Sequence, residues 1–406
     1  MAQCFLIYKE DYPWDVRVEK LATSLSKAGH EVTIICRNHG QKPVREDTPN
    51  FRIRRLPVTR LLPSFLVTLL NFPYWFNPLW LWTIFDSSRG ASKPIFIVRD
   101  LPLVKAGLLA GKLRRAPVVY DMAEVYPEMY ASILKFSESR VPHSRLKSPF
   151  LAKRYERAIL SSVDHTLVMI EESRDRLIKK GISPDKVTIV SNTPLIEKFD
   201  NEIHIHKGQN LRIVYVGFIT KLRGLDLLIK AAHEYLRNGN STDSIQIDIV
   251  GKGEEKARLI QLVEELKLSE NVKIHGWLSQ DEVDHLMARA NVGALTYRVC
   301  GHWNHTIPNK IFDYMLAGLP VLATEVIPVK RIVSEANCGV ICEDLNPVDI
   351  AKKLKMLSDP NLRNLYGKNG YKAVVESYNW SKDEAKLLSA IHTTTAKYTT
   401  ERESPI

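Results

Sequence analysis

Residues 3–36 read QCFLIYKEDYPWDVRVEKLATSLSKAGHEVTIIC. An apolar run at 3–8 is followed, over 16–27, by apolar residues at helical spacing, and Gly29 stands where a glycine ends a helix. A second apolar run follows at 31–36. The order strand, helix, strand predicts a βαβ unit and therefore a parallel sheet.

The same alternation continues along the chain in two sets, separated by the polar and irregular stretch 191–209. A chain of 406 residues has the length of two domains, so we predict two Rossmann-like, doubly wound α/β domains. Ligands of such sheets bind beyond the carboxyl ends of the strands, which favours a ligand site in a cleft between the domains. Further strands are expected at 95–98, 118–120, 165–169, 187–190, 211–216, 245–250, 272–274, 292–295, 321–323 and 339–342.

Composition and charge limit the classes of ligand that this protein is expected to bind. The formal net charge is +11, and residues 1–200 hold 31 lysines and arginines against 21 acids. We find no DNA-recognition motif beside this charge, so anionic small molecules or a membrane surface fit it better than nucleic acid. The first ten residues lack the pattern of a signal peptide, and the five cysteines show no disulfide or zinc spacing. Both observations favour the cytoplasm.

One segment, 61–85 (LLPSFLVTLLNFPYWFNPLWLWTIF), holds 25 residues without a charge. Three prolines interrupt it, which disfavours a single membrane-spanning helix. Its tryptophans and the preceding arginines are typical of the lipid headgroup region. Two interpretations stay open, a helix–loop–helix packed on the first sheet and contact with the inner face of a membrane. The tryptophans are Trp75, Trp80 and Trp82, and the arginines are Arg52, Arg54, Arg55 and Arg60.

The stretch 306–324 (TIPNKIFDYMLAGLPVLAT) predicts a helix that opens at Pro308 or Asn309 and ends at Gly318. The free N–H groups at a helix start favour phosphate, and Asp313, one turn further on, could accept hydrogen bonds from a ribose diol. Taken alone, the stretch also fits a capped surface helix with a solvated Asp313. P-loop, HExxH and GxSxG motifs are absent from the sequence.

Read with the rest of the chain, this stretch resembles the C-terminal signature of the retaining glycosyltransferase family 4, which has the GT-B fold. The branch that it resembles most makes bacterial polysaccharides. The resemblance covers nearly the whole chain, and it implies domains at 1–195 and 196–378, with a C-terminal helix and tail at 379–406 returning to the first domain. The other matching segments are 16–32 (VRVEKLATSLSKAGHEV), 118–128 (VVYDMAEVYPE), 155–164 (YERAILSSVD), 187–199 (VTIVSNTPLIEKF) and 215–224 (YVGFITKLRG).

The resemblance implies that the second domain binds the donor. Lys221 and Arg223 stand where the family places a basic pair for the pyrophosphate, a role that suits both side chains. The family's E-x7-E pair falls on His305 and Asp313, so a histidine replaces the first carboxylate at a catalytic position. Alternatively, His305 is an ordinary loop histidine. The donor-binding residues implied are Gly217, Lys221, Arg223, Gly251, Gly253, Asn304, Pro308, Asn309, Lys310 and Asp313.

The resemblance implies that the first domain binds the acceptor. Many relatives read D-x-H-E where this chain reads Asp121-Met122-Ala123-Glu124, so Asp121 and Glu124 are the catalytic candidates and an alanine replaces the histidine. A helix cap with a first-turn acid is the alternative for this pair. Trp14, Asp15 and Arg99 are expected to contact the acceptor.

The sequence therefore predicts transfer of a hexose-type sugar from a nucleoside diphosphate sugar, UDP- or GDP-linked, to a hydroxyl of a glycan or lipid-linked acceptor. The resemblance implies retention of the anomeric configuration, no metal and no other cofactor. Two rival interpretations remain open. One is a nucleotide-sugar epimerase or hydrolase of the same fold, and the other is a non-catalytic protein that binds the nucleotide sugar.

Overall fold

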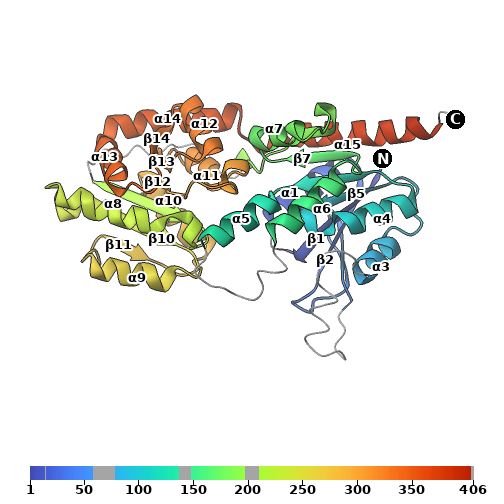
Figure 1. Cartoon of the computed structure of the whole chain (residues 1–406), viewed down its shortest axis with the longest axis horizontal. Coiled ribbons are helices and arrows are strands. Elements are labelled where there is room, and N and C mark those ends of the chain that lie inside the picture. Colours follow the sequence, from blue (N-terminus) through green and yellow to red (C-terminus); the bar gives the residue numbers. More distant parts are fainter. Residues whose placement is uncertain (14, 58–77, 137–147, 197–209, 404–406) are drawn as a thin grey trace. The chain divides into compact units, whose positions relative to one another are not determined.

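The computed structural model describes residues 1–13, 15–57, 78–136, 148–196 and 210–403, with the side chains described up to residue 398. Two parallel sheets with helices on their faces make up this part of the chain (Figure 1). The predicted fold class, two Rossmann-like domains of the GT-B type, is confirmed. The chain divides into a first unit, Met1–Pro127 with Lys147–Asn192 and Ser381–Ile406, and a second unit, Glu128–Leu146 with Thr193–Trp380.

The first unit contains an eight-stranded sheet in the order β3-β4-β2-β1-β5-β6-β7-β8. These strands are β1 (Gln3–Asp11), β2 (Glu31–Arg37), β3 (Arg45–Asp47), β4 (Arg52–Arg55), β5 (Pro94–Arg99), β6 (Val118–Met122), β7 (His165–Val168) and β8 (Val187–Ile189). All pairs are parallel except β3 with β4. The chain leaves β1 toward β2 on one side and later returns to β5 on the other. The order therefore reverses between β1 and β5, where such sheets place their ligands.

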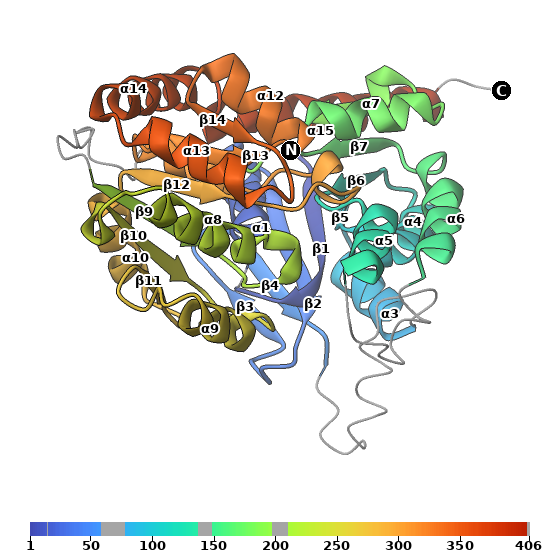
Figure 2. The same ribbon diagram turned by 60° about the vertical axis from the view of Figure 1, so that its left-hand side comes forward.

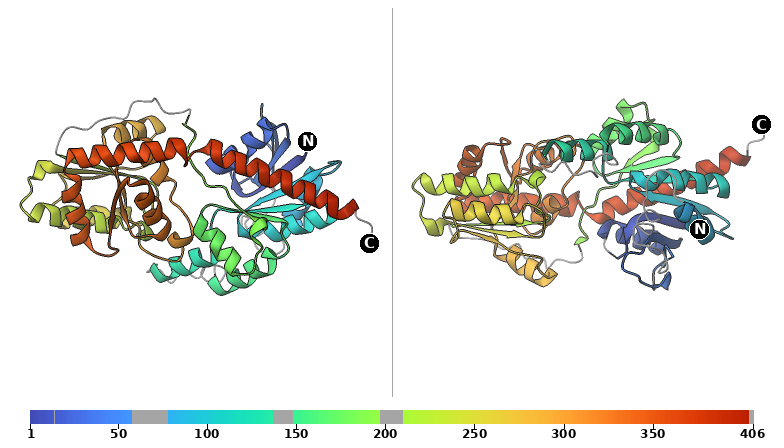
Figure 3. Two further views of the ribbon diagram at one scale, coloured as in Figure 1. Left: turned by 90° about the horizontal axis from the view of Figure 1, so that it is seen from above. Right: turned by 60° about the horizontal axis from the view of Figure 1, so that its bottom comes forward.

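The helices of the first unit flank this sheet, and α3 packs against α4 (Figure 1). They are α1 (Val16–Lys27), α3 (Pro78–Ser87), α4 (Val104–Arg114), α6 (Pro149–Leu160), α7 (Glu171–Lys179) and α15 (Trp380–Glu403), with short turns η1 (Leu101–Leu103) and η3 (Pro184–Lys186). Lys397 of α15 has its Nζ 2.8 Å from a carboxylate oxygen of Asp185 in η3. Figure 3 shows α15 as the long red helix that leads to the C-terminus.

The second unit contains a six-stranded parallel sheet in the order β11-β10-β9-β12-β13-β14. Its strands are β9 (Leu211–Val216), β10 (Ile245–Val250), β11 (Val272–Ile274), β12 (Val292–Leu295), β13 (Val321–Thr324) and β14 (Gly339–Cys342). Here the order reverses between β9 and β12. In both units, therefore, the strand order reverses beside the strand that comes first in the sequence of that sheet, β1 in the first unit and β9 in the second.

The helices of the second unit include α8 and α13, which lie side by side (Figure 2). They are α8 (Leu225–Arg237), α9 (Lys256–Glu265), α10 (Gln280–Arg289), α11 (Lys310–Leu316), α12 (Ile327–Ala336), α13 (Pro347–Leu357) and α14 (Pro360–Glu376), with short turns η5 (Lys221–Arg223), η6 (Thr242–Ser244) and η7 (Trp303–His305). Helix α5 (Tyr126–Phe136) begins in the first unit and ends in the second.

The sequence expectations differ from the structure in two places. Strands β3 and β4 were not predicted, because they read RED and RIRR and carry no apolar run. The residues from Glu128 to the end of α5 group with the second unit, whereas the expected domain 1–195 included them. The expected segment 61–85 lies outside the described residues up to 77, and its remainder belongs to α3.

Helix α14 packs closely on α11 through a glycine. A Cβ atom at Gly367 would lie 2.1 Å from the carbonyl oxygen of Gly318, which is a backbone atom that cannot easily move. We therefore expect Gly367→Ala to lower the free energy of unfolding of the second unit by about 1–3 kcal/mol, the usual cost of overpacking. Chemical denaturation measures this change. The exposed neighbour Lys368, changed to alanine, is the control, and equal stability of the two variants would contradict the close contact.

Candidate functional site

The loop that follows β9 in the second unit is held by backbone contacts with the loop that follows β10. Gly217 N donates to the carbonyl oxygen of Val250 at 3.0 Å, and Ile219 N donates to that of Lys252 at 2.9 Å. Gly251 has φ +145°, and a Cβ there would lie 1.8 Å from the carbonyl oxygen of Gly217. Glycines at these positions are therefore required for loop packing, whatever they contact in a bound donor.

Arg223 lies at the end of the turn η5, between two aromatic rings. Its guanidinium carbon is 4.5 Å from the ring centre of Tyr297 and 4.3 Å from that of Trp303. Arg223 Nη1 also donates a hydrogen bond to the Tyr297 hydroxyl. Cation–π contacts of this kind fix the plane and position of a guanidinium. A half-buried cation is thereby held where the strand order reverses.

The turn that carries Lys221 and Arg223 is fastened to the loop after β12. Arg298 Nε donates to the carbonyl oxygen of Lys221 at 3.1 Å, and Trp303 Nε1 donates to that of Leu222 at 3.2 Å. Arg298 in turn forms a buried ion pair with both carboxylate oxygens of Asp226, at 2.9 and 2.8 Å. The sequence analysis missed Tyr297, Arg298 and Trp303. The available signal was their position directly after the predicted strand at 292–295.

The segment 300–313 carries the residues matched to the family signature. His305 Nδ1 lies 2.8 Å from the carbonyl oxygen of Gly301, so this ring nitrogen carries the hydrogen. Asn304 Oδ1 accepts from Ile327 N at 3.2 Å, which ties the turn to α12. Burial and then the charge of Arg223 lower the pKa of His302 to about 3. The loop therefore carries a neutral imidazole at His302 near the Arg223 cation.

Helix α11 begins at Lys310, after Pro308 and Asn309, close to the predicted start. Pro308 is buried and Asn309 is exposed. The carboxylate of Asp313 accepts from Lys310 Nζ at 2.9 Å. Asp313 and Lys310 are therefore already partners within one turn of this helix. Their contact with a donor remains a prediction.

In the first unit Asp121 lies at the end of β6, fully buried, and both of its oxygens are engaged. Arg17 Nη2 is 2.6 Å from Oδ1, and Arg17 Nε is 3.0 Å from Oδ2. Arg99 Nη1 lies 3.3 Å from Oδ2. Burial alone would raise the pKa of Asp121, but the Arg17 and Arg99 guanidinium groups lower it below the ordinary range. These partners keep Asp121 ionised at neutral pH and in contact with two arginines, and its assignment as a base remains a prediction.

Asp15 and Arg99, both expected on the acceptor side, contact each other. Arg99 Nη2 donates to Asp15 Oδ2 at 2.8 Å, while Asp15 Oδ1 caps α1 by accepting from the backbone N–H groups of Arg17 and Val18. Glu124 follows β6 and is half-buried, and Trp14 lies outside the described residues. The structure thus brings Asp15, Arg99 and Asp121 together at the point where the first sheet reverses its order.

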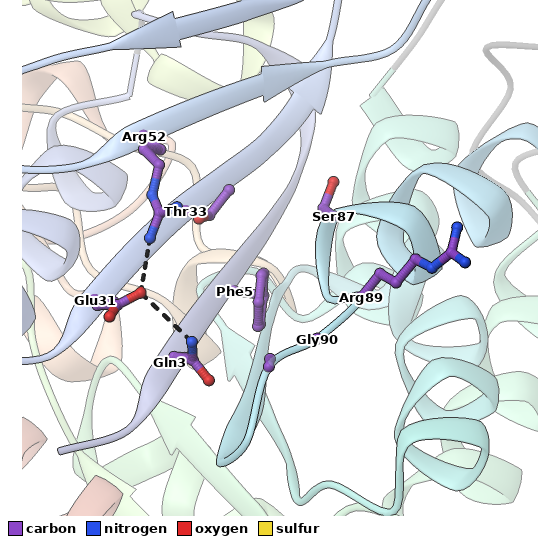
Figure 4. Close-up of a pocket in the computed structure, with 9 residues that line it drawn as sticks. Gln3, Phe5, Glu31, Thr33, Arg52, Ser87, Arg89 and Gly90 are labelled. Atoms are coloured by element: carbon purple, nitrogen blue, oxygen red, sulfur yellow. Dashed lines mark hydrogen bonds and ion pairs between the residues drawn. The ribbon is translucent and has the colours of Figure 1, made fainter.

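Two hollows in the described part of the first unit lie away from these residues. One, of about 120 Å³, is lined by Gln3, Glu31 and Arg52 at the amino ends of β1 and β2 and beside β4. In Figure 4 Glu31 bonds both Gln3 and Arg52, and Arg89 points away from this group. The second hollow, of about 340 Å³, continues along β3 and β4. Since ligands of parallel sheets bind at the carboxyl ends of the strands, we do not assign the site here.

The described part of the segment 61–85 divides its aromatic residues between core and surface. Trp80 is fully buried, whereas Trp82 is 53% exposed and Phe85 is 38% exposed. Arg55 is also buried, and Arg54 pairs with Asp86 at 2.9 Å, so neither arginine is directed at a lipid surface. Among the described residues, no helix combines the length and apolar character that crossing a bilayer requires.

Comparison with known proteins agrees with this arrangement. Residues 15–193 match the glycosyl transferase 4-like domain, and residues 197–373 match the glycosyl transferases group 1. The chain carries the two domains of a GT-B glycosyltransferase. The boundary between the two matches falls where the first unit ends and the second resumes.

Relatives of this glycosyltransferase are distant. An uncharacterized glycosyltransferase of Methanocaldococcus jannaschii is 22% identical over 82% of this chain and 82% of its own length. The amylovoran biosynthesis glycosyltransferase AmsK of Erwinia amylovora is 24% identical over 45% of this chain and 44% of its own length.

Solved structures share the fold at low identity. Sucrose-phosphate synthase from Thermosynechococcus elongatus has a TM-score of 0.76 at 16% identity, covering 97% of this chain and 100% of that chain. Anabaena HepE in complex with UDP-glucose has a TM-score of 0.67 at 13% identity, covering 96% of this chain and 99% of that chain.

The Asp121 network leads to a stability prediction. Removing one charge from a buried pair leaves the other unpaired, so we expect Asp121→Asn to lower the free energy of unfolding by about 3–5 kcal/mol at neutral pH. Because the native pKa of Asp121 is lowered, its contribution is present above the pKa of the unfolded chain and is lost as pH falls through the native pKa. The stability difference between wild type and variant should therefore shrink on acidification.

Denaturant unfolding at several pH values measures this difference. The control is Arg52→Gln, which breaks the exposed Arg52–Glu31 pair, 2.7 Å apart, and should cost only about 0–1 kcal/mol. Equal losses in the two variants at neutral pH would show that the Asp121 network does not stabilise the first unit.

Proposed function

We propose that this glycosyltransferase moves a sugar from a nucleoside diphosphate sugar to a hydroxyl of a glycan or lipid-linked acceptor. In this proposal the second unit binds the donor and the first unit binds the acceptor. The observation that carries the proposal is the position of Arg223. A cation braced by Tyr297 and Trp303 stands where the strand order of the second sheet reverses. A parallel sheet binds its ligand at this point, and a diphosphate needs a cation there.

The charge built up during the reaction fits the same residues. As the bond from the anomeric carbon to the diphosphate oxygen breaks, its electron pair stays on the diphosphate. Arg223 and Lys221 would stabilise that charge, and the aromatic brace means that Arg223 needs little reorganisation to do so. Asp313 is assigned to the ribose diol, and Asn304 and His305 to the sugar. HepE, a structural neighbour, is described in complex with UDP and with UDP-glucose, which supports a uridine donor.

The stereochemistry and the pathway are further parts of the proposal. The resemblance to family 4 supports retention of the anomeric configuration, without a metal or other cofactor. The names of AmsK and of the putative colanic acid biosynthesis glycosyltransferase WcaL of Salmonella typhimurium support a role in cell-surface polysaccharide synthesis. NMR of the product, recorded before mutarotation of any released sugar, would report the configuration.

Arg223 gives the central prediction. A hydrogen bond between charged groups contributes about 1.5–3 kcal/mol, so Arg223→Ala should weaken the affinity for UDP at least about tenfold. Thermal-shift titration with UDP and GDP measures this change and identifies the preferred nucleotide. Arg237 of α8 is exposed and pairs only with Glu234 among the contacts described, so Arg237→Ala is the matched control. If Arg223→Ala binds UDP as wild type does, the donor assignment is wrong.

Membrane association is predicted through the exposed face of α3. Since Trp80 belongs to the core, the residues to change are Trp82 and Phe85, both to serine. We expect wild type to float with anionic liposomes and the double variant to float less, because the buried apolar area that anchors it is lost. High salt should weaken the binding only in part, since salt screens charge and not apolar contact.

The control for flotation is Met356→Ser, which removes an exposed apolar side chain from α13 of the second unit. Its flotation should equal that of wild type. If the wild-type protein does not float with liposomes, Trp82 and Phe85 do not bind membranes and are assigned to contacts with protein. An acceptor without a lipid would then be favoured.

A further inference from the structure

Asp100 of the first unit combines a strained backbone conformation with a buried carboxyl group. It follows β5 directly, at the point where the sheet reverses its order, and its backbone N–H donates to the carbonyl oxygen of Asp121 at 3.0 Å. Its φ of +68° and ψ of +156° lie in a region populated almost only by glycine. Such a conformation persists where the surrounding structure imposes it, and it is common at functional sites.

One carboxylate oxygen of Asp100, Oδ1, is buried and has no hydrogen-bond partner among the described residues. Only 6% of the residue is exposed. The neighbouring Arg99 shows the complementary defect. Its Nη1 and Nη2 atoms bind Asp121 and Asp15, but its buried Nε donates to no described residue. One acceptor and one donor are therefore left open in consecutive residues, although buried polar groups are normally satisfied.

Arg99 and Asp100 are consecutive residues that also affect each other's pKa. Burial alone would lower the pKa of Arg99, but the pKa is raised by Asp100 first and then by Asp15 and Asp121. The charged and titratable groups that face Asp100 are Tyr8 and Lys9 of β1, Asp15, Arg99, Tyr120 and Asp121 of β6, and Tyr126 of α5.

These surroundings disfavour the ionised form of Asp100. Burial raises the pKa of its carboxyl, Asp121 and Asp15 add to this, and Arg99 and Lys9 offset it only in part. A raised pKa means that stability is lost as the pH rises through the native pKa. A neutral side chain at position 100 would therefore make the folded protein more stable than the aspartate does. Stability alone does not explain why an aspartate stands there.

We propose that Asp100 Oδ1 and Arg99 Nε together bind one hydroxyl group of the sugar acceptor. A hydroxyl offers one hydrogen to donate and lone pairs to accept, which matches the open acceptor of Asp100 and the open donor of Arg99. This proposal rests on the proposed function, because it places the acceptor in the first unit. It shifts the hydroxyl-binding role from Asp121, whose oxygens two arginines already occupy, to the neighbouring strand end.

The test uses the full chain, a panel of octyl glycosides as probe acceptors, and binding rather than turnover. The panel contains the octyl glucoside, galactoside, mannoside and N-acetylglucosaminide. Asp100→Asn keeps the size of the side chain and removes its charge. We expect it to weaken binding of the preferred glycoside at least about tenfold and to unfold at a higher temperature than wild type, with a margin that grows with pH.

A second variant guards against misfolding. Asp100→Gly suits the positive φ and removes the carboxyl group, so it should fold at least as stably as wild type and should also lose the glycoside. Asp175→Asn, an exposed carboxylate of α7, is the control and should change neither property. Binding of UDP, measured in parallel, should be the same in all four proteins, because its site lies in the second unit.

The outcomes separate the two proposals. Unchanged glycoside binding in Asp100→Asn overturns the assignment. If this variant also unfolds at a lower temperature than wild type, the partner of Oδ1 is a buried water molecule and not a sugar hydroxyl. A wild-type protein that binds UDP but none of the four glycosides also overturns it. Failure to bind UDP or GDP would instead count against the proposed function, while loss of glycoside binding in Asp100→Asn would still support the hydroxyl site.

Discussion

The first unit depends on one buried ion pair, that of Asp121 with Arg17. Arg17 reaches from α1 to the end of β6, and its Nη1 also donates to the carbonyl oxygen of Val190, just beyond β8, at 2.8 Å. Three elements far apart in the sequence thus meet at one guanidinium. Because Asp121 also holds Arg99, the ends of β5 and β6 are fixed against the start of α1. Asp15, Arg99 and Asp121 are held in place at this edge by that network.

The two units share a reversal of strand order, but the side chains at the reversal differ in charge. In both, the strand order reverses beside the first strand, and the polar residues after that strand meet those after its new neighbour. In the second unit this point holds Arg223, braced by aromatic rings, which suits an anionic diphosphate. In the first unit it holds three carboxylates, Asp15, Asp100 and Asp121, among arginines, which suits a neutral, hydroxyl-rich ligand. This difference in charge supports the proposed division, in which the second unit binds the donor and the first unit binds the acceptor.

The sequence predicted the fold because apolar periodicity reports strands buried on both faces, as in 95–98 and 118–120. It missed β3 and β4, whose pairing stabilises charged strands that carry no such pattern. It proposed a donor-binding role for Lys221 and Arg223, and that role stays a prediction. It did not single out Tyr297 and Trp303, because their contact with Arg223 arises only when β9 and β12 become neighbours. In the same way, spacing along the chain does not reveal that Arg17, 104 residues before Asp121, donates to both of its carboxylate oxygens.

Asp100 and Asp121 show why position in the sheet is not enough to assign a carboxylate. Both end neighbouring parallel strands, and both are buried, yet the pKa of Asp121 is lowered while that of Asp100 is raised. Burial is common to the two, so partners decide the sign. Asp121 receives hydrogen bonds from two guanidinium groups, whereas Oδ1 of Asp100 receives none from the described residues. The pKa values of these two carboxyl groups thus shift in opposite directions at one edge of the sheet. This difference supports a structural role for Asp121 and the proposed ligand-binding role for Asp100.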